Sequence, residues 1–311
     1  MSLLRWSCDL AGLCFAKSQL LHVGKTQNQR FWFYLRLKIA WGSTSLCLSA
    51  TIRLRFFFYR KYDTIAVINK YIVANRKGIG VILNFNDFYA ELLATGFSLL
   101  GGGSDEGMPN LVKFGWQEEP TDTPLRWHTG DAETDPWEWR VRVLKECNDI
   151  AYAKVFFKKG GYITKEWYPY FLAARRGQDS FEDAYNNGTI SYLAKRIYDV
   201  VADSVGLPVH TIKQQIGFRK EQKSKFDAAL TELQMKLYLT VCGEQQKNSA
   251  QGLGYAWPSM VFCTTEQFLG AEVFAEAKDI DAAEAIWQIT KRILELNPQA
   301  EKKQIMRFIK G

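Results

Sequence analysis

The run from residue 126 to residue 140, RWHTGDAETDPWEWR, holds the side chains of this chain that are best suited to chemistry. It packs three tryptophans, one histidine and four acidic residues into 15 positions. In an enzyme, a carboxylate here would act as a general base, and the indoles would stack against a base or a sugar. The candidate bases are Asp131, Asp135 and Glu138. The alternative is a loop held by aspartate turns, with Trp137 and Trp139 plugged into the core.

The cysteines and histidines do not indicate a metal site. The six cysteines include no CxxC pair, and the three histidines complete no zinc-binding spacing. We therefore expect neither a metal nor a cofactor. Cys242 and Cys263 are expected to be small buried thiols in a reducing cytoplasm rather than a disulfide.

A cluster of basic residues gives the clearest indication of a partner. Residues 213–225 contain five basic residues and one acidic residue, Glu221. Such a cluster is typical of a surface that contacts a phosphate backbone, so we predict binding to duplex DNA. The alternative is a solvated loop with ordinary lysines. With a serine inside the cluster and a lysine from a later loop, the predicted contacts are Lys213, Arg219, Lys220, Lys223, Ser224, Lys225 and Lys247.

The elements that must position this cluster lie between residues 190 and 263. Ser191 can cap a first helix that ends at Gly206, and Pro208 can open a second helix that ends before Gly217. A third helix is expected from about Ser224, followed by strands over 237–242 and 255–263. Three helices and a hairpin in this order predict a winged helix-turn-helix, whose third helix enters the major groove by its N-terminal end. Modules of this kind also serve as protein-interaction domains.

A second basic region, interleaved with aromatic residues, is a candidate for another nucleic-acid surface. It combines the end of the tryptophan-rich run with a strand-turn-strand pattern over 152–163 and a following helix. Lysines that flank a turn are also common solvated residues, which is the alternative. The residues of this second surface are Trp137, Trp139, Arg140, Lys154, Lys158, Lys159, Arg175 and Arg176.

Composition predicts a folded α+β protein, mainly helical, with winged helix-turn-helix units and short β-hairpins. The net charge of +7 is unevenly distributed, because residues 1–62 hold ten basic residues and one acid. The remaining 249 residues hold 30 basic and 32 acidic residues, so the basic pI says little about the folded body. The longest uncharged stretch of the first segment, 14 residues, is too short to span a membrane, and we expect a cytoplasmic protein.

Four segments are expected along the chain. Residues 1–62 form a basic extension with no clear helix or strand period, and our hypothesis is that they derive from a start codon assigned too early. Residues 63–180 form an α+β domain that carries the tryptophan-rich loop. Residues 181–268 form the winged helix, and residues 269–311 form C-terminal helices.

Several short stretches resemble a bacterial family of uncharacterised winged-helix proteins that is related to AlkZ-type alkylpurine and crosslink DNA glycosylases. The similarity covers roughly residues 85–311. The matching stretches are His128-Thr129-Gly130, residues 135–140, Ala151-Tyr152-Ala153-Lys154, Phe156-Phe157, Gly161-Tyr162-Ile163, Trp167-Tyr168-Pro169, Leu233-Gln234-Met235, Gly254-Tyr255 and Trp257-Pro258.

The resemblance implies a protein built from winged helices with a role in DNA repair. The related glycosylases position the attacking water with a Gln-apolar-Gln or Gln-apolar-Asp motif. Gln214-Gln215 and Gln245-Gln246 lack that spacing, and Gln27-Asn28-Gln29 has a polar centre. No catalytic residue is therefore transferred from the family. The hypotheses are a DNA-binding protein, an N-glycosylase-like enzyme that acts on damaged bases, and a protein-interaction module without DNA binding.

Overall fold

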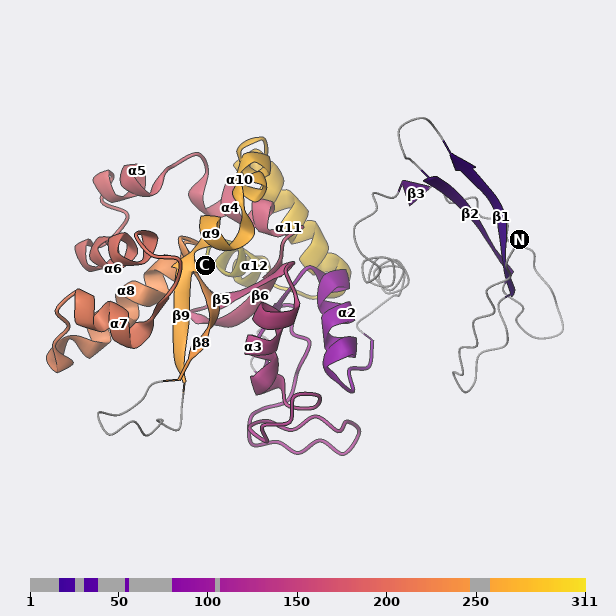
Figure 1. Ribbon diagram of the computed structural model, residues 1–311, viewed down its shortest axis with the longest axis horizontal. Coiled ribbons are helices and arrows are strands. Elements are labelled where there is room, and N and C mark those ends of the chain that lie inside the picture. Colours follow the sequence, from indigo (N-terminus) through magenta and orange to yellow (C-terminus); the bar gives the residue numbers. More distant parts are fainter. Residues whose placement is uncertain (1–16, 26–30, 39–53, 56–79, 104–106, 247–257) are drawn as a thin grey trace. The chain divides into compact units, whose positions relative to one another are not determined.

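The computed structural model describes residues 17–25, 31–38, 54–55, 80–103, 107–246 and 258–311 (Figure 1). It divides the chain into two compact units, Met1–Thr64 and Ile65–Gly311. The first unit contains an antiparallel sheet of β1 (Lys17–Lys25), β2 (Phe31–Lys38) and β3 (Leu54–Arg55). The sequence of this unit shows no alternating period, but β2 opens with four aromatic or apolar residues of high strand propensity, Phe-Trp-Phe-Tyr.

The second unit is α+β, as expected, and is built around one six-stranded antiparallel sheet. The strand order is β4-β6-β5-β8-β9-β7. A single register pair, Tyr152 with Val241, joins β5 to β8, and the Thr240 hydroxyl donates to the Tyr152 carbonyl at 3.2 Å. One sheet thus contains strands from two of the predicted segments, 63–180 and 181–268. The domain boundaries at residues 180 and 268 stay a prediction. The strands are β4 (Phe97–Leu99), β5 (Ile150–Phe156), β6 (Lys159–Thr164), β7 (Leu207–Pro208), β8 (Leu239–Gln245) and β9 (Ser259–Thr264).

The helices flank this sheet: α5 to α8 form one group on the left in the view of Figure 1, and α4, α10, α11 and α12 form a second group beside the strands. A short 3₁₀ turn, Lys220–Gln222, directly precedes α8. The helices are α2 (Phe85–Thr95), α3 (Pro136–Glu146), α4 (Tyr168–Arg176), α5 (Phe181–Asn186), α6 (Tyr192–Ala202), α7 (Val209–Gln215), α8 (Lys223–Met235), α9 (Thr265–Leu269), α10 (Ala271–Lys278), α11 (Ala282–Leu296) and α12 (Lys302–Lys310).

The three helices expected between residues 190 and 237 are confirmed, although the first, α6, ends at Ala202 rather than at Gly206. Ser191 caps α6 by accepting from the Ala194 N–H at 3.3 Å. Pro208 precedes α7 as its N-cap, because its φ of −69° and ψ of 146° are extended rather than helical. Gly217 takes the left-handed φ of 65° just past α7, as its position in the sequence indicates.

The hairpin is also confirmed in part. Its first strand begins at Leu239 rather than Leu237, because Leu237 has a φ of 62° in the turn that follows α8. The second strand begins at Ser259, while residues 255–257 lie outside the described residues. Cys242 and Cys263 are free thiols, as expected; Cys263 is buried and Cys242 is half-buried.

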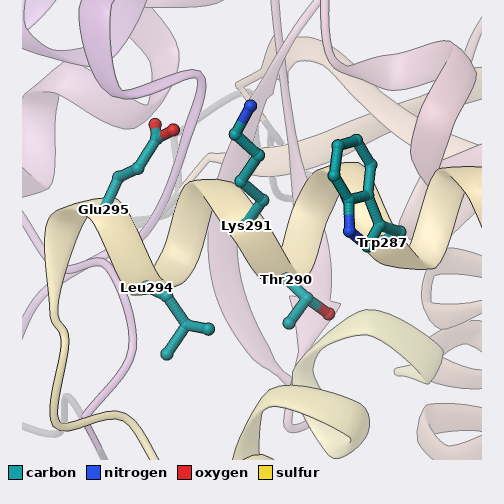
Figure 2. Close-up of a pocket in the computed structure, with 5 residues that line it drawn as sticks. All are labelled: Trp287, Thr290, Lys291, Leu294 and Glu295. Carbon is teal, nitrogen blue, oxygen red and sulfur yellow. The ribbon is translucent and has the colours of Figure 1, made fainter.

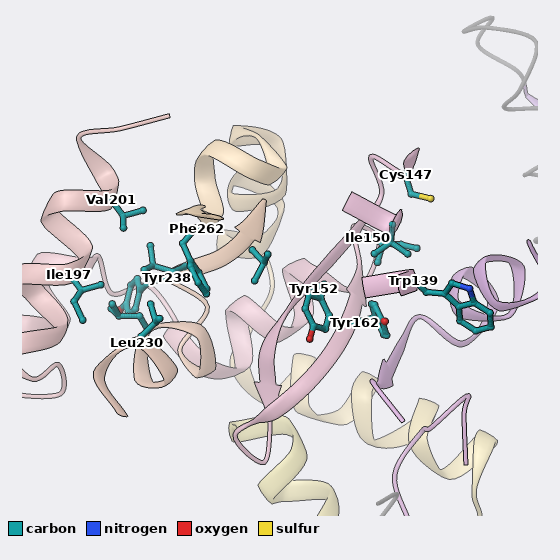
Figure 3. Close-up of a cluster of buried hydrophobic side chains, with 14 of the residues drawn as sticks. Trp139, Cys147, Ile150, Tyr152, Tyr162, Ile197, Val201, Leu230, Tyr238 and Phe262 are labelled. Atoms are coloured by element: carbon teal, nitrogen blue, oxygen red, sulfur yellow. The ribbon is translucent and has the colours of Figure 1, made fainter. Parts of the chain in front are cut away.

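Alternate residues of β5 enter two hydrophobic clusters. Ile150 and Tyr152 belong to a cluster that runs from α2 and α3 to α6 and α8 (Figure 3). Ala151, Ala153 and Val155 belong to a cluster with α4, α11 and α12. This division follows from the period of two along a strand, which sends successive side chains to opposite faces. The sheet therefore carries apolar contacts on both faces.

The guanidinium of Arg175, at the end of α4, joins three other segments. It donates to the carbonyls of Val155 in β5 at 2.8 Å and of Met235 at the end of α8 at 2.7 Å. It also donates to the carbonyls of Phe308 and Ile309 in α12, at 2.9 and 2.7 Å. Burial lowers the pKa of Arg175 to about 9, which leaves the group charged at neutral pH. One side chain therefore satisfies four backbone acceptors.

We predict that Arg175→Met lowers the free energy of unfolding by about 3 kcal/mol or more. The substitution keeps much of the apolar stem but leaves four carbonyls without their donor, and each buried unsatisfied group costs about 1–3 kcal/mol. Urea unfolding followed by circular dichroism measures this change. Lys154→Met is the control, because its exposed side chain should change stability by no more than about 0.5 kcal/mol. Equal stability of the two variants would contradict the assignment.

Candidate nucleic-acid interface

The N-terminal end of α8 projects from the protein, while its C-terminal half is buried. Every residue from Arg219 to Lys225 is exposed. Farther along the helix, Phe226 and Leu233 are completely buried. The residue before the helix, Gln222, makes no side-chain hydrogen bond to the first turn. The first N–H groups of α8 thus lie among exposed residues, next to the basic cluster.

The predicted basic residues surround this helix end. Arg219, Lys220, Lys223 and Lys225 are exposed, and within the described part of the chain none forms an ion pair with a carboxylate. Ser224 is exposed in the first turn. Lys213 and Lys247 are the two predicted residues that do not join these. The Lys213 ammonium lies 4.9 and 4.8 Å from the ring centres of Phe218 and Phe226, and Lys247 lies outside the described residues.

Strand β7 links the helices to the hairpin. It pairs with β9 through two register pairs, Leu207 with Phe262 and Pro208 with Val261. This pairing attaches the connection between α6 and α7 to strand β9 of the hairpin. The element order is therefore α6, β7, α7, α8, β8 and β9. At the end of β8, Glu244 forms a 3.2 Å ion pair with Lys145 of α3. This ion pair joins the hairpin to the helix that begins within the tryptophan-rich run.

Asp135 organises the tryptophan-rich run from within. Its side chain has no exposed surface and accepts three backbone N–H groups: those of His128 at 3.1 Å, Gly130 at 2.9 Å and Trp137 at 2.8 Å. The last of these bonds caps α3. His128 adopts the left-handed φ of 61° in the loop that Asp135 holds. The carboxylate is thus surrounded by backbone donors and faces no solvent, which suits a structural role.

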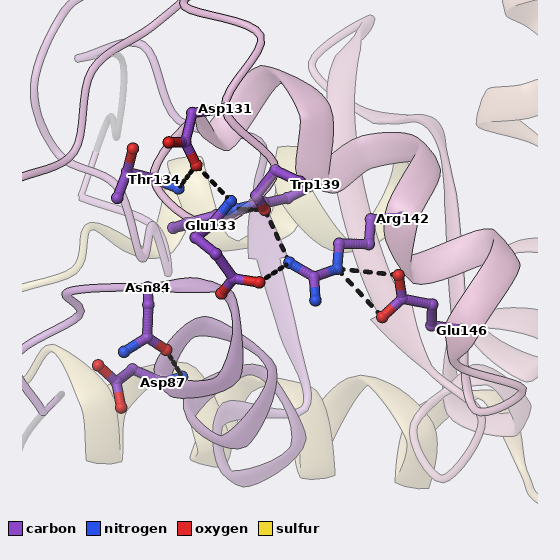
Figure 4. A network of polar contacts seen from close by, with 9 residues as sticks. Asn84, Asp87, Asp131, Glu133, Thr134, Trp139, Arg142 and Glu146 are labelled. Atoms are coloured by element: carbon purple, nitrogen blue, oxygen red, sulfur yellow. Dashed lines mark hydrogen bonds and ion pairs between the residues drawn. The ribbon is translucent and has the colours of Figure 1, made fainter.

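The other two candidate carboxylates retain surface. Asp131 is exposed, and one oxygen accepts from the N–H groups of Glu133 and Thr134 at 2.7 and 3.1 Å (Figure 4). Glu138 is half-buried in the first turn of α3. In the same network, Arg142 donates to Glu133 at 2.8 Å and pairs with Glu146 at 3.0 Å. A general base among Asp131, Asp135 and Glu138 stays a prediction.

The second predicted surface separates into inward arginines and outward lysines. The Arg140 guanidinium lies 3.4 Å from the ring centre of Trp137 and donates to the Trp137 carbonyl at 2.6 Å. Arg176 pairs with Glu266 at 3.0 Å, and Arg175 holds the four carbonyls described above. Trp139 is completely buried, and Trp137 is half-buried. The exposed members of this surface are Lys154, Lys158 and Lys159.

The sequence pattern does not reveal Trp116. It lies in the loop that precedes the tryptophan-rich run, yet its ring contacts Trp127, His128 and Trp137 at centre-to-centre distances of 6.0, 5.5 and 5.7 Å. About half of the side chain, 52%, is exposed. The sequence does give one indication of its importance. Trp116 is an isolated tryptophan in a loop rich in glycine and acidic residues, where a small polar residue would suffice.

Other kinds of site find little support in the described structure. No group of three or more His, Cys, Asp and Glu side chains among the described residues is arranged to hold a metal ion. None of the described helices combines the length and the apolar character that crossing a membrane requires. A shallow pocket on the outer face of α11 contains none of the predicted site residues (Figure 2); its lining is Trp287, Thr290, Lys291, Leu294 and Glu295.

We predict that Asp135→Ala lowers the free energy of unfolding by about 2–4 kcal/mol, because it removes a helix cap and the acceptor of two further backbone N–H groups. Asp135→Asn keeps one carbonyl oxygen and should lose roughly half as much. Thermal and urea unfolding measure both changes. Glu138→Gln is the control, with an expected change of no more than about 0.5 kcal/mol. A fully stable Asp135→Ala variant would rule out the structural role.

Comparison with known proteins identifies a family. A family model described as AlkZ related matches residues 82–310. None of the curated proteins matches the chain, and no solved structure does. The match spans most of the chain, including the six-stranded sheet, α8 and the tryptophan-rich run, and it confirms the resemblance that the sequence motifs indicate. The chain therefore belongs to the AlkZ-related family.

Proposed function

We propose that this protein binds duplex DNA through the N-terminal end of α8 and the β8–β9 hairpin. The observation that carries the proposal is the set of exposed cations around the start of α8, for which the described residues provide no carboxylate partner; they are Arg219, Lys220, Lys223 and Lys225. Unpaired surface cations in one place attract the phosphate backbone and release its condensed counterions.

The arrangement of elements supports a winged helix-turn-helix reading of this region. Helices α7 and α8 would be the helix-turn-helix pair, and the β8–β9 hairpin would be the wing. The pairing of β7 with β9 holds the wing against the helices. In proteins of this type, the second helix of the pair presents its N-terminal residues to the major groove. Here that end is the exposed stretch over 223–225, while Phe226 and Leu233 farther along α8 are buried.

The end of α8 also has the positive pole of a helix to offer a phosphate. Gln222 does not cap the first turn with its side chain, but the Lys223 N–H already donates to the Lys220 carbonyl of the preceding 3₁₀ turn. The lysine ammonium groups are therefore the main hydrogen-bond donors that a phosphate oxygen would find here. Glu221 lies within the cluster and Asp227 follows it, but the local charge stays positive.

Family membership supports a role in DNA repair and raises a second candidate function, an N-glycosylase-like activity on damaged bases. The exposed Asp131 and half-buried Glu138 would then supply the general base. Two described glutamines do not offer a substitute for the missing Gln-apolar-Gln motif. Gln234 is buried, accepting from the Lys154 N–H and donating to the Leu230 carbonyl, both at 2.9 Å. Gln267 donates to the Ser204 carbonyl at 2.8 Å.

We predict that Lys220→Glu/Lys223→Glu weakens binding of the full chain to duplex DNA by at least about tenfold and flattens its salt dependence. Each phosphate contact contributes about −0.9 to the slope of log K against log salt, so losing two contacts should reduce the slope by about 2. Fluorescence anisotropy with a labelled duplex at several salt concentrations measures both effects.

Lys302→Glu/Lys303→Glu is the matched control, because it makes the same charge change at two exposed lysines of α12. It should leave the slope unchanged. If the two double variants bind equally, contact at α8 is wrong. If the unaltered protein does not bind duplex DNA at low salt, the protein is not a DNA-binding protein, and a protein-interaction role takes its place.

Release of free bases from alkylated DNA, and its loss in Asp131→Asn or Glu138→Gln, tests the glycosylase-like activity.

A further inference from the structure

Four aromatic rings meet at the surface beside the start of α3. We call Trp116, Trp127, His128 and Trp137 the aromatic cluster. The ring centres of His128 and Trp137 are 4.9 Å apart, and Trp116 contacts both of these rings edge-on. Trp127 forms the buried base of the cluster with 8% exposure, whereas Trp116 is 52% exposed. The cluster thus has an anchored side and an open side.

Glycines behind the cluster allow its rings to lie where they do. A Cβ atom on Gly102 would lie 2.1 Å from Nε1 of Trp116, and one on Gly101 would lie 2.9 Å from the Trp127 ring. Both glycines also have positive φ values, 81° and 125°, that other residues rarely adopt. The backbone therefore approaches both indoles closely, which a residue with a side chain would prevent.

Buried side chains also fix the positions of His128 and Trp137 in the cluster. Asp135 binds the N–H groups of His128 and Trp137, and it keeps His128 in a left-handed conformation. The Arg140 guanidinium lies against one face of the Trp137 ring, 3.4 Å from its centre. Two of the rings are thus fixed by buried groups before any ligand arrives. Strained conformations and preformed aromatic surfaces of this kind concentrate at binding sites.

We propose that the aromatic cluster stacks an unpaired nucleobase of the DNA that α8 holds. Trp116, which is about half exposed, offers a flat π system on which any base can stack. The imidazole of His128 is exposed beside it and can exchange a hydrogen bond with the edge of the base. This inference rests on the proposed DNA-binding function and adds the kind of DNA, one with a base outside the stack.

The charge around the cluster favours a base over a phosphate. Glu118, Asp131 and Glu138 lie near the aromatic residues in the chain and would repel the DNA backbone. An uncharged planar ring carries no such penalty. The cluster therefore differs from the α8 surface, where exposed cations attract phosphate. Stacking here should depend weakly on salt, while binding at α8 should depend on it steeply.

The loop over 107–135, which carries three of the four rings, extends downward in the view of Figure 1, as does the β8–β9 hairpin. The ion pair between Lys145 of α3 and Glu244 of β8 joins the helix that carries Trp137 to the hairpin. A duplex that follows the hairpin would thus approach the aromatic cluster, so a base turned out of its stack would have a surface to meet.

The test uses the full chain and two duplexes, one fully paired and one carrying a single bulged 2-aminopurine, whose fluorescence falls when it stacks. We expect tighter binding of the bulged duplex and quenching of its fluorescence. Trp116→Ala should remove the quenching and weaken binding of the bulged duplex about tenfold, with the paired duplex unaffected. Trp116→Phe keeps an aromatic face and should retain most of the preference.

Trp287→Ala is the matched control, because Trp287 is 53% exposed on α11 and lies outside the aromatic cluster (Figure 2). It should bind both duplexes like the unaltered protein. Unchanged quenching and affinity in Trp116→Ala would overturn the inference, as would equal binding of both duplexes by the unaltered protein. In either case, retained binding of the paired duplex leaves the proposed function standing. Loss of all DNA binding in the unaltered protein would overturn both.

Discussion

The hydrogen bonds of Arg175 are the constraint on which the arrangement of the second unit depends. A guanidinium can donate five hydrogen bonds in a fixed plane, and here it reaches carbonyls of β5, α8 and α12 from the end of α4. The carbonyl at the end of α8 belongs to Met235. The basic cluster lies at the opposite, exposed end of the same helix. The contact of Arg175 thus anchors the helix that presents the cluster.

The features that the sequence predicts well are those with local causes. Ser191 caps α6, Gly217 follows α7 with a positive φ, and the third helix begins within one residue of its expected start. Long-range features could not be predicted. From the sequence alone, Arg175 is taken for a surface cation. Its four acceptors come from segments up to 134 positions away, so no local pattern indicates them. Asp135 likewise reads as a candidate base, whereas only the folded loop directs three N–H groups to it.

The two candidate surfaces follow different physical rules. Around α8, cations remain in solvent without carboxylate partners in the described structure, so their charge is available to a polyanion at long range. Beside the aromatic cluster, the cation Arg140 is buried against Trp137, and acidic residues lie nearby in the chain. That surface offers contact area and shape instead of charge. Both surfaces lie within the residues that match the AlkZ-related family.

The salt dependence of duplex binding by the unaltered protein tests the central claim most directly. Four exposed cations at α8 predict a linear fall of log K with log salt, with a slope of about −3 to −4. Fluorescence anisotropy between low and physiological salt gives this slope without any substitution. A slope in that range is the result that the account predicts. Absence of binding at low salt, or binding that does not change with salt, would contradict it.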